Sequence, residues 1–238
     1  MSLRATHKSQ LQDGEFDVLV IGAGINGAAS ASALAHRGLR TALVDARDFA
    51  GYTSQNSSNL IWGGIKYLET FEFALVRRLC SSRNVLMRAY PSAVRETRFL
   101  AAISRTAPRS RLAVWLGAWL YWFLGSCMTR IPRLLSRDAL KRAEPVVNAG
   151  MTQGAVEYSD ALLVDGDARF VYSLVRRAAD AGCVTVNYLN VVNAQRSGEY
   201  WRVDLLDSVD GGKMSTRARV IINGKTIFEF FIIFLIKV

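Results

Sequence analysis

The most constraining feature of this sequence is Gly22-Ala23-Gly24-Ile25-Asn26-Gly27, which places three glycines in the spacing G-x-G-x-x-G. It directly follows residues 16–21 (FDVLVI), an apolar run rich in β-branched residues that is typical of a buried parallel strand. The alanine-rich residues 25–37 stop before Gly38 and predict a helix with a glycine C-cap. Residues 40–44 repeat the buried-strand pattern. This part of the chain therefore predicts strand, tight turn, helix and strand, as in an α/β fold with a parallel sheet.

In that setting each glycine has a physical role. Gly22 permits the tight turn, Gly24 lets the backbone approach a pyrophosphate, and Gly27 lets the helix pack closely on the strand. The helix N-terminus offers unpaired N–H groups to phosphates. Asp45 follows Gly27 by 18 positions, at the end of the second strand, where a carboxylate accepts hydrogen bonds from ribose hydroxyls. The pattern predicts a dinucleotide site, although it does not separate FAD from NAD, and glycines that merely form a turn are the plainer alternative.

Composition limits the classes of partner. The 238 residues are 50% hydrophobic, enough for a sizeable core, and carry 30 Lys+Arg against 20 Asp+Glu for a net charge of +10. The basic residues are spread along the chain as singles and pairs such as Arg77 and Arg78, not gathered in one tract with aromatics. We therefore expect no nucleic-acid partner, and an acidic surface or a phosphorylated small molecule suits the charge better.

The cysteine and histidine content argues against a fold that is stabilised by disulfides or by a bound metal ion. Cys80, Cys127 and Cys183 lie far apart, and the chain has only two histidines. We expect neither a disulfide framework nor a metal site. The polar start of the chain lacks the apolar segment of a secretory signal, so we expect residues 1–15 to be a disordered leader of a cytoplasmic protein.

Further along the chain, residues 69–89 predict an amphipathic helix. Its apolar face would hold Phe71, Leu75, Leu79 and Leu86, and its polar face Arg77, Arg78 and Arg83. Residues 111–125 predict an apolar helix with three tryptophans, too short to span a bilayer and expected in the core. The other predictions are strands over residues 99–103, 154–159, 183–188, 200–206 and 217–222, and a helix over residues 168–181.

A longer motif resembles one family. The serine-rich loop after Asp45 leads into TSQNSSNLIWGGIKYLE, residues 53–69, and this run is similar to that of the FAD-dependent glycerol-3-phosphate dehydrogenases. The similarity spans about residues 16–223 and continues through residues 71–77, 86–91, 157–160, 167–169 and 201–203. It implies a Rossmann-like FAD-binding domain of the glutathione-reductase type, like that of glycine and D-amino-acid oxidases, with part of a substrate domain.

The resemblance also implies an activity. Members of that family oxidise sn-glycerol 3-phosphate to dihydroxyacetone phosphate with FAD and pass the electrons to a membrane quinone or another acceptor. It further implies a cytoplasmic protein, peripheral on the inner face of a membrane.

The family's site residues carry over position by position. Gly22, Gly24, Gly27 and Asp45 would bind the adenosine and pyrophosphate of FAD, and Ser57, Ser58, Gly63 and Gly64 would line the flavin. Lys66 and Tyr67 would meet the substrate phosphate, Lys66 without the bidentate fork of an arginine. Trp62 stands where many members have histidine and cannot act as a base, so no catalytic base is identified. We expect Trp62 to pack against the flavin or the core.

The resemblance breaks after Asn223. The family continues there with A-T/A-G-P-W, whereas this chain runs through Gly224 into IFEFFIIFLIKV. We therefore expect an oxidoreductase domain over residues 16–223 that is incomplete at its C-terminus, with substrate-domain elements within about 91–215, and an aberrant apolar tail over 224–238. Two alternatives stay open: a related FAD enzyme acting on amino or 2-hydroxy acids, and a non-catalytic dinucleotide-binding remnant.

Overall fold

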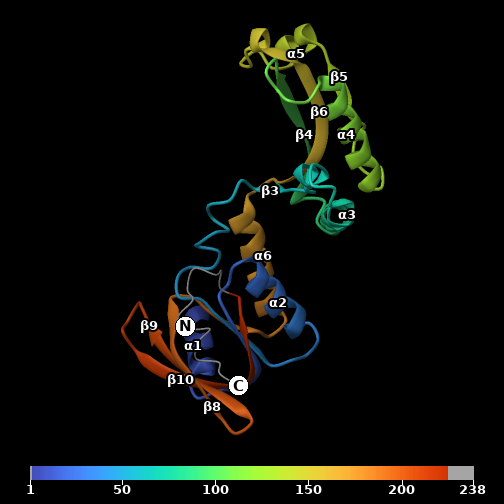
Figure 1. Cartoon of the computed structure of the whole chain (residues 1–238). Coiled ribbons are helices and arrows are strands. Elements are labelled where there is room, and N and C mark those ends of the chain that lie inside the picture. Colours follow the sequence, from blue (N-terminus) through green and yellow to red (C-terminus); the bar gives the residue numbers. More distant parts are fainter. Residues whose placement is uncertain (1, 225–238) are drawn as a thin grey trace. The chain divides into compact units, whose positions relative to one another are not determined.

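The computed structural model describes residues 2–224, and within it the chain divides into two units (Figure 1). Unit 1 contains the chain up to Ser57 and from Gly166 onward, and unit 2 is Ser58–Asp165. Residues 166–215, the later part of the range within which substrate-domain elements are expected, belong to unit 1 and pair with its strands. The expected apolar tail lies outside the described residues except for Gly224.

Unit 1 is built on a six-stranded sheet in the order β7-β2-β1-β10-β9-β8. The strands are β1 (Glu15–Ile21), β2 (Thr41–Val44), β7 (Val184–Val186), β8 (Leu189–Ser197), β9 (Tyr200–Asp207) and β10 (Lys213–Asn223). The first part of β10 pairs antiparallel with β9, and its last part pairs parallel with β1. The neighbours β1, β2 and β7 are also parallel to one another, which confirms the predicted α/β fold.

Two helices, α2 (Ile25–Ala35) and α6 (Asp167–Asp180), pack together in unit 1. The buried face of α2 consists of small residues such as Ala28 and Ala31, which allow close packing. Leu19 and Leu43, from adjacent strands, are fully buried. The apolar runs that predicted β1 and β2 therefore form part of a core.

The start of the chain is ordered, contrary to the expected disordered leader. Ser2 caps helix α1 (Leu3–Leu11) by accepting a hydrogen bond from the Ala5 amide. His7 and Leu11, one turn apart, are buried, and α1 packs on β7. The prediction was wrong because the helix is held by tertiary contacts of two residues within a polar sequence.

Unit 2 contains a four-stranded antiparallel sheet and three helices (Figure 1). Its strands are β3 (Leu60–Ile61), β4 (Val94–Ser104), β5 (Arg133–Leu135) and β6 (Thr152–Leu163), with β6 paired to the other three. The helices are α3 (Phe73–Ala89), α4 (Arg111–Leu124) and α5 (Arg137–Ala143), and two short 3₁₀ helices are η1 (Ile65–Leu68) and η2 (Ala149–Met151). No helix among residues 2–224 is both long and apolar enough to cross a bilayer.

The buried face of α3 differs from the predicted one. Its buried residues are Val76, Cys80, Arg83 and Asn84, whereas Leu75, Leu79 and Leu86 are only partly buried. Arg83, which we expected on the polar face, is among the most buried side chains of the described chain, at 1% exposed. The prediction failed because it assigned every arginine to solvent, although an arginine can be buried when it is paired.

Helix α4 also departs from its prediction. We expected this tryptophan-rich helix in the core, but only Ala118 and Tyr121 are buried along it. Apolar residues such as Leu116 and Phe123 are exposed within unit 2. An apolar sequence without a clear polar face does not indicate which side of the helix is covered.

Candidate functional site

The turn after β1 has the geometry that the G-x-G-x-x-G motif requires. Gly22 adopts φ 93°, which residues with a β-carbon rarely adopt. A β-carbon on Gly27 would lie 1.8 Å from the carbonyl oxygen of Gly22, so only glycine lets α2 pack this closely. The nearest atom to a β-carbon on Gly24 would be Ser54 Oγ, at 4.0 Å. The turn is therefore closed toward the sheet and open beside Gly24.

The N-terminus of α2 begins at this open side. Gly24 is the N-cap residue, and no side chain caps the helix there. The first N–H groups of a helix have no partner within it, and they carry the positive end of its dipole. Ile25, the first residue of α2, is exposed. Backbone donors and positive potential thus coincide where phosphates of a nucleotide bind in such folds.

Asp45 directly follows β2, as predicted, and its carboxylate accepts hydrogen bonds that hold the glycine turn in place. Oδ2 accepts a hydrogen bond from the Ala23 amide at 2.6 Å, and Oδ1 accepts one from the Arg47 amide at 2.9 Å. The side chain is largely buried. A carboxylate oxygen accepts more than one hydrogen bond, so this bracing is compatible with a further bond to a ribose hydroxyl.

In unit 2 the predicted glycine pair leads directly into η1. Gly64 adopts φ 82°, and its carbonyl oxygen accepts the Tyr67 amide at 2.9 Å to open the 3₁₀ turn. Lys66 and Tyr67 lie on this turn and are exposed. The Trp62 and Tyr67 rings lie 5.7 Å apart between centroids. Trp62 is 38% exposed, so the part of the prediction that placed it in the core is not met.

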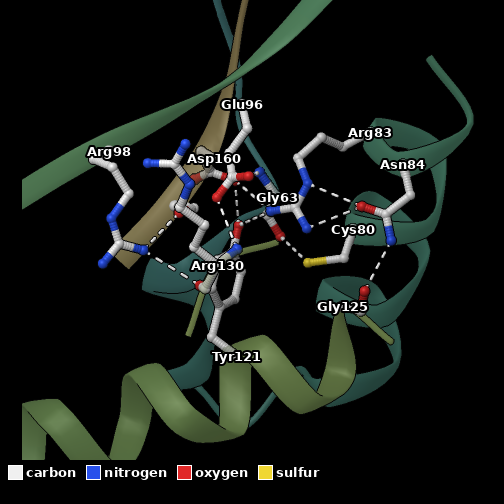
Figure 2. A network of polar contacts seen from close by, with 11 residues as sticks. Gly63, Cys80, Arg83, Asn84, Glu96, Arg98, Tyr121, Gly125, Arg130 and Asp160 are labelled. Carbon is white, nitrogen blue, oxygen red and sulfur yellow. Dashed lines mark hydrogen bonds and ion pairs between the residues drawn. The ribbon is translucent and has the colours of Figure 1, made fainter. Parts of the chain in front are cut away.

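Behind the glycine pair lies a buried polar cluster, which we define as Arg83, Tyr121 and Asp160 (Figure 2). Oδ1 of Asp160 accepts hydrogen bonds from Arg83 Nη1 and Tyr121 Oη, each at 2.6 Å, and from the Gly63 amide at 3.1 Å. Arg83 also donates to Tyr121 Oη at 3.1 Å. All three side chains are at most 3% exposed. Asp160 thus receives three donors on one oxygen within the interior of unit 2.

Burial changes the ionisation of two side chains beside Gly63, namely Tyr121 and Cys80. Burial is the main cause that raises the pKa of the Tyr121 hydroxyl, and the nearby Asp160 raises it further. The hydroxyl therefore remains a neutral donor. Burial also raises the pKa of the Cys80 thiol, which donates to the Gly63 carbonyl oxygen at 3.6 Å. Side chains therefore form hydrogen bonds with both the N–H and the C=O of residue Gly63.

The structure brings together some of the predicted residues and separates others. Gly22, Gly24 and Gly27 lie at the turn from β1 into α2 in unit 1, and Asp45 is hydrogen-bonded to that turn. Gly63, Gly64, Lys66 and Tyr67 form one segment in unit 2. Ser57 and Ser58 lie on either side of the unit boundary, in the expected irregular loop. The sequence reasoning missed the buried polar cluster. The signal for it was an aspartate in the otherwise apolar end of β6.

Comparison with known proteins identifies the family of this chain. The family described as FAD dependent oxidoreductase matches residues 17–224. This chain belongs to that family. The match covers both units, including the glycine turn and the buried polar cluster.

Two individual relatives show which enzymes the chain is similar to in sequence. The chain is 35% identical over 209 residues to a glycerol-3-phosphate dehydrogenase of Pseudomonas tolaasii, covering 87% of this chain and 39% of the relative. It is 36% identical to a D-erythritol 1-phosphate dehydrogenase of Brucella abortus, with 87% and 40% covered. The chain therefore spans about two fifths of the length of these relatives.

A solved structure supports the fold. The glycerol-3-phosphate dehydrogenase of Bacillus halodurans, complexed with FAD, superposes with a TM-score of 0.67 at 21% identity. The superposition covers 93% of this chain and 37% of that one. The superposition confirms the α/β fold predicted from the sequence.

Proposed function

We propose that this chain binds FAD and oxidises sn-glycerol 3-phosphate to dihydroxyacetone phosphate, with a quinone or another acceptor taking the electrons. The observation that carries the proposal is the open glycine turn of unit 1, with Asp45 at the end of the next strand. The glycerol-3-phosphate dehydrogenases among the relatives support the choice of substrate. The D-erythritol 1-phosphate dehydrogenase supports a wider class, phosphorylated polyols.

The residues of unit 1 fit the adenosine and pyrophosphate of FAD. The amides at the start of α2 would bind the pyrophosphate, and the missing side chain of Gly24 leaves room for its approach. Asp45 would accept a ribose hydroxyl while holding Ala23 in place. Ser57, Ser58 and the glycine pair are proposed to line the flavin. When bound, FAD supplies the hydride acceptor for the carbon that bears the substrate hydroxyl.

Lys66 and Tyr67 are proposed to bind the substrate phosphate. The Lys66 ammonium is exposed and makes no ion pair with a described residue, so its charge is available to an anion. Tyr67 adds a hydroxyl donor on the same short turn. Trp62 has no basic atom, so the proton of the substrate hydroxyl goes to a group other than Trp62.

A membrane surface is the proposed place of electron transfer, on the cytoplasmic face. Leu112, Leu116, Leu120 and Phe123 lie on α4 at spacings of four, four and three and are all exposed. Such a stripe, with the net charge of +10, suits attachment to an anionic membrane without spanning it.

The test is a titration of the purified chain with FAD, followed by desalting and a visible spectrum. We expect flavin absorbance to be retained, and to bleach without oxygen when glycerol 3-phosphate is added. D-Erythritol 1-phosphate, an amino acid and a 2-hydroxy acid are added in parallel. Bleaching by either of the last two alone supports the amino- or hydroxy-acid alternative. Retained flavin that no substrate bleaches supports the non-catalytic remnant, and loss of flavin on desalting overturns FAD binding.

A further inference from the structure

Gly63, which precedes η1, is fixed by side chains at both of its backbone polar groups. Its N–H donates to Asp160 and its C=O accepts from Cys80, so side chains from β6 and α3 hold both backbone polar groups of this residue. A β-carbon on Gly63 would lie 2.1 Å from Tyr121 Oη and 3.0 Å from Arg83 Nη1. The peptide therefore lies directly against the buried polar cluster, and glycine is required here by the protein's own packing.

The contact continues from Gly63 into η1. Gly64 follows in the left-handed region, where a β-carbon would also lie 2.7 Å from Leu79 Cδ1. Its carbonyl oxygen accepts the Tyr67 amide, and the Tyr67 carbonyl oxygen accepts the Glu72 amide at 3.0 Å. Hydrogen bonds on the consecutive residues Gly63 and Gly64 thus link Asp160 to the turn that carries Lys66 and Tyr67.

We infer that Asp160, Arg83 and Tyr121 are positioning residues for Lys66 and Tyr67, acting through the Gly63 peptide. The inference rests on the proposed function, in which Lys66 and Tyr67 bind the substrate phosphate. The three residues are buried, so they act on the substrate only through the segment that they hold. Arg83 pairs with Oδ1 of Asp160, the same oxygen that accepts the Gly63 amide, so the ion pair holds that oxygen in place beside Gly63.

The experiment compares Tyr121→Phe with Leu140→Ala in the full chain. Tyr121→Phe removes one donor to Asp160 and one acceptor of Arg83, and keeps the ring. Leu140 is fully buried in α5, at the other end of unit 2 from β3 (Figure 1), so its truncation is the matched control for a loss of stability. Hydrogen exchange of residues 63–68 is measured without FAD, and KM and kcat for glycerol 3-phosphate are measured with FAD bound.

In Tyr121→Phe we expect exchange in residues 63–68 to rise on the order of tenfold or more, because two hydrogen bonds that fix Asp160 and Arg83 beside Gly63 are lost. KM should rise several-fold while kcat changes less. Leu140→Ala should leave both exchange in this segment and KM as in the wild type. Unchanged exchange in Tyr121→Phe, or an equal rise in both variants, overturns the inference. Faster exchange with an unchanged KM also overturns it.

A further variant separates this inference from the proposed function. Lys66→Ala should raise KM and leave exchange at Gly63 unchanged, because it removes the charge and not the hold on the peptide. A wild-type chain that binds FAD but does not oxidise glycerol 3-phosphate overturns the proposed function. In that case the hydrogen exchange of Tyr121→Phe, compared with that of Leu140→Ala, alone decides whether the buried polar cluster holds residues 63–68 in place.

Discussion

Oδ1 of Asp160 accepts the amide hydrogen bond of Gly63 at 3.1 Å, although 97 positions separate the two residues. The same oxygen pairs with Arg83, which comes from α3. One carboxylate oxygen thus joins a strand, a helix and the glycine pair that precedes η1. Because buried charges are stable only when they are paired, the stability of unit 2 should depend on this contact.

Arg83→Leu should therefore lower the free energy of unfolding of unit 2 by about 3–5 kcal/mol, since it leaves the Asp160 carboxylate buried without its cation. The measurement is unfolding in urea, monitored by tryptophan fluorescence. This signal reports mainly unit 2, because four of the five tryptophans lie there. Arg78→Leu, on the exposed face of the same helix, is the control and should change stability by less than about 0.5 kcal/mol.

The double variant Arg83→Leu/Asp160→Asn checks the cause. The amide that replaces the carboxylate carries no charge, so the double variant should be less destabilised than the sum of the two single variants by about 1 kcal/mol or more. Strictly additive effects would show that the two side chains do not act as a pair.

The elements around the glycine motif could be predicted because their signals are local. The apolar run before Gly22 and the alanine-rich run after it predict β1 and α2 to within two residues at each end. The buried polar cluster could not be predicted in this way, because its pairing of Arg83 with Asp160 joins positions 77 apart. A helical periodicity that scores every arginine as exposed then selects the wrong face of α3.

The start of the chain shows the same limit. Helix α1 has a polar sequence, and its burial depends on His7 reaching the backbone of Thr185 at 3.1 Å. No nearby residue predicts that partner. Local patterns therefore predict the framework of the site, and long-range polar contacts decide how the framework is held.

The glycine turn predicts a separation between folding and cofactor binding. Gly24→Ala adds a methyl group into open space and should leave stability within about 1 kcal/mol of the wild type, while it weakens FAD binding by obstructing the pyrophosphate. Gly27→Ala places the same group 1.8 Å from a backbone oxygen and should lower the unfolding free energy by several kcal/mol, of order ~3.

The two effects are measured by thermal unfolding and by FAD titration. Gly117→Ala is the control, because a β-carbon there meets no atom within 4 Å and glycine is a poor helix former. It should raise stability by up to about 1 kcal/mol and leave FAD binding unchanged. If Gly24→Ala binds FAD as the wild type does, the pyrophosphate does not lie beside Gly24.

Low pH should weaken the ion pairs that Arg4 and Lys8 of α1 form with Asp207 of β9. Burial alone would raise the pKa of Asp207, but hydrogen bonds from Lys8 and Arg4 outweigh it and lower the pKa to about 2. The pKa of an unfolded aspartate is about 3.9, so the stabilisation is complete above that value and is lost as the pH falls toward 2. At neutral pH it amounts to about 2–3 kcal/mol.

Asp207→Asn should therefore be less stable than the wild type by about this amount at pH 7, with a difference that shrinks between about pH 4 and 2. Unfolding in urea across this range measures it. Asp210→Asn, which alters the more exposed partner of Lys8, should show a much smaller difference at every pH. A difference for Asp207→Asn that does not depend on pH would assign the effect to packing and not to charge.

The exposed stripe of α4 predicts how the chain binds a membrane. Sedimentation with vesicles that contain phosphatidylserine should show binding that weakens with salt but persists in part at high salt, because charge is screened and apolar burial is not.

Leu116→Gln/Phe123→Gln removes two exposed apolar side chains and should lower the salt-resistant binding on the order of tenfold or more. Val209→Gln, an equally exposed apolar residue of unit 1, is the matched control and should bind as the wild type does. Binding that high salt abolishes in the wild type would show that charge alone holds the chain at the surface, and α4 would then have no part in it.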